Sequence, residues 1–482
     1  MIVRNLAASL TLSACALATA ADSTAAAPAA NAASSTAPVP ANSAAPGSTA
    51  PATVTASSTA PAAAAPTGPV PGPTPGQVSL ALKPGDHVAL VGDSITEQKI
   101  YTRFIADYLW ASSGVADLDV AQFGWGGETA PGFLSHLDRS LDWFKPTAVT
   151  LLYGMNDGHY TTFTPDIGKQ YGDAMGKILD GLKTLGATTV VVSTPGAVDT
   201  TTFKRATPAA VYNDNLAALG AIGKGLADAR SLRFADTHEA MIDAMARAKA
   251  AFGQNYAVCG GDGVHPDNDG HLVMMASFLE NLGCDGAIAT ITIGADGKAT
   301  ASAGHTIASD GAHSTELITD KGIDIDSTRW PFVLGGDGKA TNSTRAMAPF
   351  IDFTARLDRF TVVMPDCTWA KAKITWGTVS VTVDGAQLKT GVNLMDVFTV
   401  TPFDKAEAGL DAAVGKLQAT ETSLVKGLMN SPMRGDIESD AQSKTLLGQL
   451  IDRQVAVRAD KVTAIKALLV PVHYHLTVAE AK

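Results

Sequence analysis

Three short apolar runs, each ending in a polar block that contains glycine, constrain the fold of this chain more than any other feature. The runs are residues 87–91, 119–123 and 149–153. The blocks that follow them are Gly92-Asp93-Ser94-Ile95-Thr96, Gly126-Gly127-Glu128-Thr129 and Gly154-Met155-Asn156-Asp157. Further strands are predicted at 189–193 and 233–236, with amphipathic helices between the strands. This alternation predicts an α/β fold, a parallel sheet with helices on both faces.

The polar blocks are expected to meet, because ligands of such sheets bind beyond the carboxyl ends of the strands. A fourth block, Asp262-Gly263-Val264-His265, follows the fifth predicted strand. Ser94 offers a nucleophilic hydroxyl, His265 a base and Asp262 a carboxylate that orients the imidazole. The backbone N–H groups of Ser94 and Gly127 and the amide of Asn156 can hold an oxyanion. The set suits acyl transfer and requires neither a metal nor a cofactor.

These four blocks, in this order, resemble the SGNH or GDSL-like serine hydrolase superfamily over residues 84–284. The resemblance implies a flavodoxin-like sheet, the SGNH hydrolase fold, and a serine esterase with Ser94, Asp262 and His265 as its triad. It leaves the substrate open, because the family includes lipases, lysophospholipases and thioesterases. A non-catalytic surface protein that binds glycans with the same fold is the alternative from another class.

The N-terminus is typical of an export signal, predicted at residues 1–21. Within it, Leu12-Ser13-Ala14-Cys15 resembles the lipobox of bacterial lipoproteins, which implies cleavage before Cys15 and attachment of lipid to it. The other interpretation is ordinary cleavage after Ala20 or Ala21. Either route predicts an exported bacterial protein, which is periplasmic, a lipoprotein of the cell envelope, or secreted.

Residues 22–82 are predicted to be a disordered linker. No charged side chain lies between Asp22 and Lys83, and the stretch is almost wholly Ala, Pro, Ser, Thr and Gly. Such a composition buries too little apolar area to offset the entropy of ordering the chain. We expect a spacer between the targeting segment and a hydrolase domain at residues 83–285.

The remaining chain is predicted to form two further units. Alternating segments at 289–293, 298–301, 360–364, 372–376 and 379–383 predict a β-rich accessory unit over residues 286–402. Residues 403–482 are expected to form a helical hairpin and tail. The apolar stripes of the two helices are Leu410, Val414, Leu417, Leu424 and Leu428, and Leu446, Leu450, Val462, Ile465 and Leu469.

Charge and aromatic residues narrow the choice of partners. A net charge of −11 argues against a nucleic acid, which requires a basic face. The residues that could either stack on a sugar ring or pack around the site's loops are Trp125, Tyr153, His159 and Tyr160. Together with export and the linker, they favour a carbohydrate carrying O-acyl, chiefly O-acetyl, esters. Whether Cys259 and Cys284 pair cannot be decided from their spacing.

Overall fold

The computed structural model describes residues 78–308 and 322–481. The predicted signal segment with Cys15, and residues 22–77 of the predicted linker, lie outside the described residues. Residues 78–82 belong to the folded part, so the predicted end of the linker is wrong. Leu82 is buried, and the Ala81 N–H donates to the carbonyl of Leu282 at 2.9 Å. Burial of Leu82 and this backbone pairing fix the segment.

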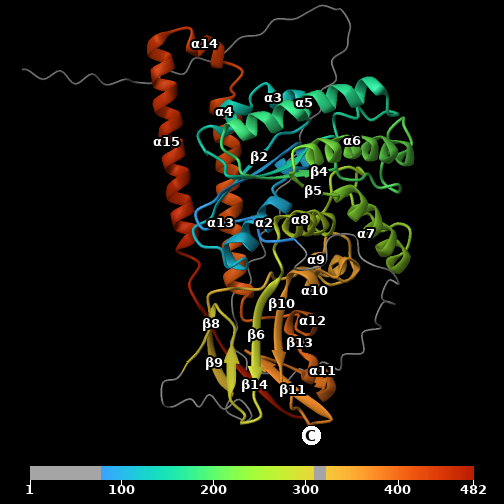
Figure 1. The fold of residues 1–482 in the computed structure, drawn as a ribbon, viewed down its shortest axis with the longest axis vertical. Helices are drawn as coiled ribbons and strands as arrows, with labels where there is room; N and C mark the ends of the chain where they lie inside the picture. The colour runs from blue at the N-terminus through green and yellow to red at the C-terminus, as the bar shows by residue number, and fades with distance from the viewer. Residues whose placement is uncertain (1–77, 309–321, 482) are drawn as a thin grey trace, which may run out of the picture. The chain divides into compact units, whose positions relative to one another are not determined.

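The five strands expected in the hydrolase region form one parallel sheet in the order β2-β1-β3-β4-β5 (Figure 1). The strands are β1 (His87–Gly92), β2 (Asp119–Gly124), β3 (Ala148–Leu152), β4 (Thr189–Ser193) and β5 (Arg233–Ala235). This is the flavodoxin-like order, with β2 at one edge. The predicted α/β fold is confirmed.

Helices cover both faces of this sheet (Figure 1). They are α1 (Ser94–Glu97), α2 (Tyr101–Ala111), α3 (Ala130–Leu134), α4 (Leu137–Leu141), α5 (Pro165–Thr184), α6 (Ala209–Ala229), α7 (Thr237–Phe252) and α8 (Asn268–Leu282). Along β1, Val88 and Leu90 join the core beneath α2, α7 and α8, whereas Ala89 and Val91 join the core beneath α3, α4 and α5. The apolar runs are continuous because both faces of each strand are buried.

The β-rich unit contains two sheets, in the orders β13-β10-β6-β7 and β12-β11-β14-β9-β8. Their strands are β6 (Ala287–Ile293), β7 (Ala299–Ala301), β8 (His305–Ile307), β9 (Ile323–Ser327), β10 (Arg359–Val363), β11 (Lys371–Trp376), β12 (Val379–Asp384), β13 (Val392–Asn393) and β14 (Val472–Glu480). Short helices connect them: α9 (Thr344–Met347), η1 (Ala348–Ile351), α10 (Phe353–Leu357), α11 (Gly385–Thr390) and α12 (Leu394–Val397). Phe360, Trp376, Phe403 and Tyr474 form an aromatic core from both sheets and the segment after them.

The C-terminal part forms the expected helical hairpin and then returns to the β-rich unit. Its elements are α13 (Asp404–Thr422), the π-helical segment η2 (Ser423–Met429), α14 (Arg434–Glu438), α15 (Ala441–Lys466) and β14. The alternating pattern of residues 472–475 predicts a solvated strand, and β14 is a strand, but it lies between β9 and β11 and pairs with both. Leu446 and Leu450 were expected to be buried with their stripe and are 56% and 45% exposed, because α14 and the start of α15 extend beyond the sheet.

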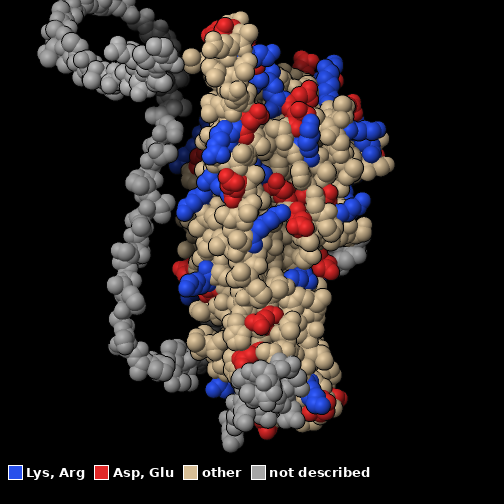
Figure 2. All heavy atoms as spheres, turned by 90° about the vertical axis from the view of Figure 1, so that its left-hand side faces the viewer, with Lys and Arg blue, Asp and Glu red and all other residues tan. Residues whose placement is uncertain are grey.

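The surface carries both signs of charge. Figure 2 shows acidic and basic side chains interspersed over one face of the described residues. None of the helices that the structure describes combines the length and the apolar composition needed to cross a bilayer.

Candidate active site

Ser94 lies directly beyond the carboxyl end of β1, where the chain turns into α1. Asp93 caps this helix, and its Oδ1 accepts from the Ile95 N–H at 3.0 Å. A Cβ at Gly92 would lie 2.2 Å from Thr96 Oγ1 and 2.7 Å from the Leu152 carbonyl oxygen. The turn therefore requires glycine, and it leaves Ser94 half-buried with its backbone N–H at the start of a helix.

His265 comes from the loop between α7 and α8 and contacts Ser94. Its Nε2 is 2.8 Å from Ser94 Oγ, and its Nδ1 is 2.7 Å from Asp262 Oδ2. The other oxygen of Asp262 accepts from the backbone N–H groups of Val264 and His265, both at 2.9 Å. Gly263 makes this tight turn with a φ of +74°. The structure thus brings the three predicted triad residues together in one relay.

The hydrogen bonds determine the protonation states of Asp262 and His265. Burial alone would raise the pKa of Asp262, but hydrogen bonds from the His265 ring and from two backbone N–H groups hold the pKa well below its usual value. The same bond to Asp262 raises the pKa of His265 against the opposing effect of burial. Since Asp262 is ionised, it can only accept, and Nδ1 must carry a proton. In neutral His265, Nε2 is therefore free to accept the proton of Ser94.

Donors for an oxyanion lie at the ends of β2 and β3. Gly127 has a φ of +73°, and its N–H has no partner among the described residues. Asn156 is held by two contacts: its Nδ2 donates to the Glu128 carbonyl at 3.0 Å, and its Oδ1 accepts from the Tyr160 hydroxyl at 3.3 Å. The second amide hydrogen of Asn156 therefore remains available. These donors, with the Ser94 N–H, are the ones that the sequence predicted.

The two buried aspartates of the blocks, Asp93 and Asp157, act as scaffolds for their loops. Burial raises the pKa of Asp93 to about 7 and that of Asp157 to about 6, despite backbone hydrogen bonds to each. Asp157 Oδ1 accepts from the Ala130 N–H at 2.9 Å and so ties the third block to the second. Neither carboxylate is hydrogen-bonded to the His265 ring, which contacts Asp262 and Ser94.

Sequence reasoning missed a polar network beneath the second block. Glu128 is buried and accepts from the Tyr153 hydroxyl at 2.7 Å, while its other oxygen is 2.6 Å from His136 Nε2. His136 also contacts Ser140 at 2.8 Å. Nothing local in the sequence links His136 to Glu128. The network fixes the turn that carries Gly127.

The aromatic residues near the site mostly pack against other residues of the chain. Tyr153 is fully buried, so its suggested contact with a sugar is wrong. Trp125 packs on His136 with ring centroids 4.9 Å apart, and Tyr160 packs on Tyr212 at 5.0 Å. His159 is exposed, and His159 and Tyr160 both have φ near +55°. Two successive non-glycine residues in this conformation are rare and mark local strain next to Asn156.

The other histidines and cysteines lie outside the triad. Burial lowers the pKa of His271 to about 3, so this ring stays neutral. His473 and His475 on β14 pair across the sheet with Asp326 and Asp324 at 3.0 and 2.8 Å. All three described cysteines are buried and free, so Cys259 and Cys284 are unpaired.

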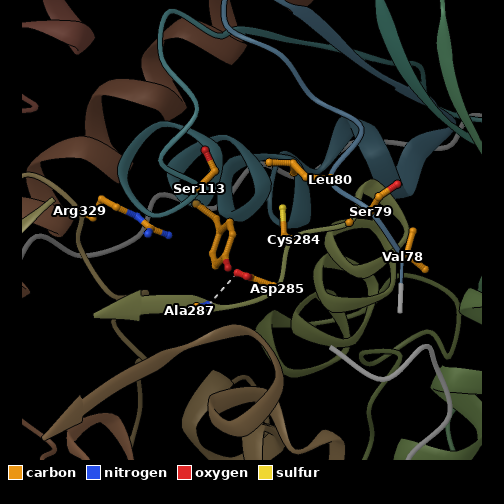
Figure 3. Close-up of a pocket in the computed structure, with 10 residues that line it drawn as sticks. Val78, Ser79, Leu80, Ser113, Cys284, Asp285, Ala287 and Arg329 are labelled. Atoms are coloured by element: carbon orange, nitrogen blue, oxygen red, sulfur yellow. Dashed lines mark hydrogen bonds between the residues drawn. The ribbon is translucent and has the colours of Figure 1, made fainter. Parts of the chain in front are cut away.

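A pocket of about 390 Å³ lies away from the triad (Figure 3). Its wall includes Leu80, Ser113, Cys284 and Arg329, and Figure 3 shows these side chains between α2, α8 and the start of β6. The Arg329 guanidinium donates two hydrogen bonds to the carbonyl of Ser112, at 2.7 and 3.0 Å. The triad instead opens at the surface, where Asp262 is exposed.

Comparisons with known proteins bear on the family and the fold of the chain. The model of the GDSL-like Lipase/Acylhydrolase family matches residues 90–273. A gut microbial diltiazem-metabolizing enzyme, BT4096, has a similar structure with a TM-score of 0.63 and 21% identity, covering 85% of this chain and 98% of that chain. The shared fold therefore extends well beyond the hydrolase domain.

Two smaller proteins are similar over less of the chain. Axe2, an acetylxylan esterase from Geobacillus stearothermophilus, has a TM-score of 0.36 and 19% identity over 42% of this chain and 96% of its own. LAE5, an alpha/beta hydrolase enzyme from the metagenome of Lake Arreo, Spain, has a TM-score of 0.35 and 17% identity over 43% of this chain and 99% of its own. Curated proteins yield no match. The match of the family model alone identifies residues 90–273 as a GDSL-like lipase/acylhydrolase domain, a hydrolase of ester bonds.

Proposed function

We propose that this protein is an exported serine esterase that removes O-acyl groups, chiefly O-acetyl groups, from carbohydrate. The observation that carries the esterase mechanism is the relay from Ser94 Oγ to His265 Nε2 at 2.8 Å and from His265 Nδ1 to Asp262 at 2.7 Å. Such a relay activates a hydroxyl that is otherwise a weak nucleophile.

The reaction has two halves. Ser94 attacks the ester carbonyl while His265 takes its proton, and the N–H groups of Ser94, Gly127 and Asn156 hold the resulting oxyanion. His265 returns the proton to the departing alcohol, which leaves an acyl group on Ser94. A water molecule then gives its proton to His265 and attacks the acyl group, and collapse of this intermediate releases the acid and restores Ser94.

The proposal of a small acyl group is supported by the polar residues that surround the site. Gly126 and Gly127 carry no side chain, and the exposed residues nearby include His159, Arg205 and Asp262. The Arg205 guanidinium lies 4.8 Å from the centroid of the Tyr160 ring. Burying a methylene group contributes about 0.8 kcal/mol to the free energy of binding, and an acyl chain that lies over polar groups gains little of this. Hydroxyl-rich alcohols suit such polar surroundings better than lipids.

Export is supported by the sequence of residues 1–21, and the two processing routes differ at Cys15. Mass spectrometry of the mature N-terminus separates them. A start at a lipidated Cys15 indicates an anchored enzyme, and an unmodified start near Asp22 indicates a soluble exported one. Retention of Met1 in the mature protein would contradict export.

The substrate proposal is tested with a panel of esters. Acetate release from acetylated polysaccharides is measured beside hydrolysis of aryl esters of increasing acyl length, with diltiazem included because an enzyme of similar fold metabolizes it. We expect acetate release from polysaccharide and a steep loss of aryl ester hydrolysis as the acyl chain lengthens. Ser94→Ala is the inactive control. A preference for long acyl chains would make the protein a lipase or lysophospholipase instead.

A further inference from the structure

The loop that presents Gly127, residues 125–128, is held at one end by the contacts of Glu128, but the two glycines before Glu128 have few supports. Gly126 and Gly127 are exposed, and no described atom lies within 4 Å of the position that a Cβ of Gly127 would take. The loop follows β2, which is the edge strand of the sheet. Its backbone is tied back by the Trp125 N–H, which donates to the Gly92 carbonyl at 3.0 Å. Both ends of the loop are thus held, and a further contact to Gly126 or Gly127 would restrict the backbone between them.

Glu97 supplies this further contact from beside the nucleophile. It is the last residue of α1, the helix that begins at Ser94. Glu97 Oε2 accepts from the Gly126 N–H at 2.5 Å, and Glu97 Oε1 is 2.5 Å from Lys426 Nζ. One carboxylate thus connects the loop to a residue that follows it by about three hundred positions in the sequence.

Lys426 lies in η2 and contacts Glu97 and Trp125, the residue before Gly126. Besides Glu97, its Nζ lies 5.1 Å from the centroid of the Trp125 ring. The π-helical turn is firmly anchored, because its Leu424 and Val425 are buried in the core of the sheet. π-Helical turns often occur at functional sites, since they change the direction of a side chain within a helix.

The helix before η2 is attached to the strand that carries the loop. Glu421 Oε2 accepts from the Gln122 N–H at 3.0 Å, and Gln122 Nε2 donates to Thr422 Oγ1 at 2.6 Å. The hairpin therefore holds β2 and the loop after it as one piece. These contacts restrict the backbone of Gly126 and Gly127, which have no side chains of their own to pack.

We propose that Lys426 is a positioning residue for ester hydrolysis: it fixes Glu97, and through Glu97 it holds the Gly126–Gly127 backbone where the Gly127 N–H meets the oxyanion. The C-terminal hairpin is then part of the catalytic apparatus. The proposal rests on the role of Gly127 in the proposed function. It assigns Lys426 no contact with substrate.

The test compares Lys426→Met with a matched variant, using 4-nitrophenyl acetate and the full chain. A displacement of about 1 Å in a catalytic group can cost about a hundredfold in rate, so we expect kcat to fall at least about tenfold while KM changes less than twofold. Lys426→Arg should restore most of the lost activity, because it keeps the cation. The control is Asp411→Asn, which removes the Arg103–Asp411 pair. That pair has the same length of 2.5 Å, is similarly exposed, and joins the hairpin to α2 away from the loop.

A double-mutant cycle shows whether Lys426 acts through Glu97. In a Glu97→Gln background, Lys426→Met should lower kcat little further, since the two residues form one support. Equal kcat losses in Lys426→Met and Asp411→Asn would overturn the proposal, as would a change confined to KM or full additivity with Glu97→Gln. The wild-type protein serves as the independent check: if it fails to hydrolyse the ester and Ser94 resists a fluorophosphonate, the proposed function itself is wrong.

Discussion

His265 must be neutral to take the proton of Ser94, so its titration sets the acidic limit of turnover. The hydrogen bond to Asp262 raises the pKa of His265 above its ordinary value of 6.5. Turnover should therefore be full above this raised pKa and decline as the pH falls through it. The dependence of kcat/KM on pH, measured with a soluble aryl ester, reports this value for the free enzyme.

Asp262→Asn tests the cause of that raised pKa. The amide removes the negative charge, so the pKa of His265 should fall and the acidic limb should move to lower pH. At the same time kcat should drop by up to about 10⁴, because the imidazole is no longer held in the productive tautomer. An acidic limb that stays in place would show that another group controls it.

Asn156→Ala is expected to act on the transition state. The amide is already oriented by Glu128 and Tyr160, so one hydrogen remains for charge that develops on the carbonyl oxygen. We predict a loss of kcat of about a hundredfold or more with little change in KM. A rise in KM at unchanged kcat would instead place Asn156 in substrate binding.

At this scale the triad was predictable from the sequence, because each of its residues sits in a short block with its own turn chemistry. Ser94 follows a buried strand, and Asp262 lies three residues before His265. The pairings of Glu128 with His136 and of Glu97 with Lys426 were not predictable. No local pattern marks two residues that meet only after the chain has folded.

Strands with a continuous apolar run or a clear alternation were predicted close to where they lie, whereas the short strands β8, β9 and β13 were not predicted. The five strands of the parallel sheet were expected within about a residue of where they lie, because both of their faces are buried. β14 pairs with β9 and β11, which lie far before it in the sequence. The exposure of Leu446 and Leu450 was missed, because an apolar stripe alone does not show how far a helix extends beyond its neighbours.

The hairpin is locked to the sheet by Arg458 of α15. Arg458 is 2.8 Å from Glu421 and makes a two-pronged contact to Asp119 at 2.7 and 2.8 Å. The side chains of Arg458 and Glu421 are 4% and 0% exposed. Arg458→Leu should lower the free energy of unfolding by about 3–5 kcal/mol, because it leaves a buried carboxylate without its partner.

Urea denaturation measures this loss, and Arg453→Leu on the same helix is the matched control because Arg453 is exposed. Adding Glu421→Gln to Arg458→Leu should recover part of the stability, since the buried charge is then gone. Equal stabilities for the Arg458 and Arg453 variants would contradict a structural role for the buried ion pair.

Across the whole molecule, the chain enters the β-rich unit twice and returns once in between to the hydrolase domain. It leaves the parallel sheet at β6, returns to cover β2 with α13, and re-enters the β-rich unit at β14. The hairpin is therefore fixed at both ends. The similarity in fold to BT4096 covers 85% of this chain, so the accessory units belong to the same architecture as the hydrolase domain.

A chain that ends at Pro471 tests this arrangement. Removing β14 deletes an inner strand and exposes the edges of β9 and β11. It also exposes the apolar residues against which the buried Tyr474, Leu476 and Val478 had packed. Unpaired edges promote association, so we expect the shortened chain to aggregate on size-exclusion chromatography and α15 to become sensitive to protease. As a control, replacing the exposed His473 by Thr keeps the strand and should leave both properties unchanged. If the shortened chain stayed monomeric with a protected α15, the hairpin would be held by the hydrolase domain alone, and the β-rich unit would not be needed to position it.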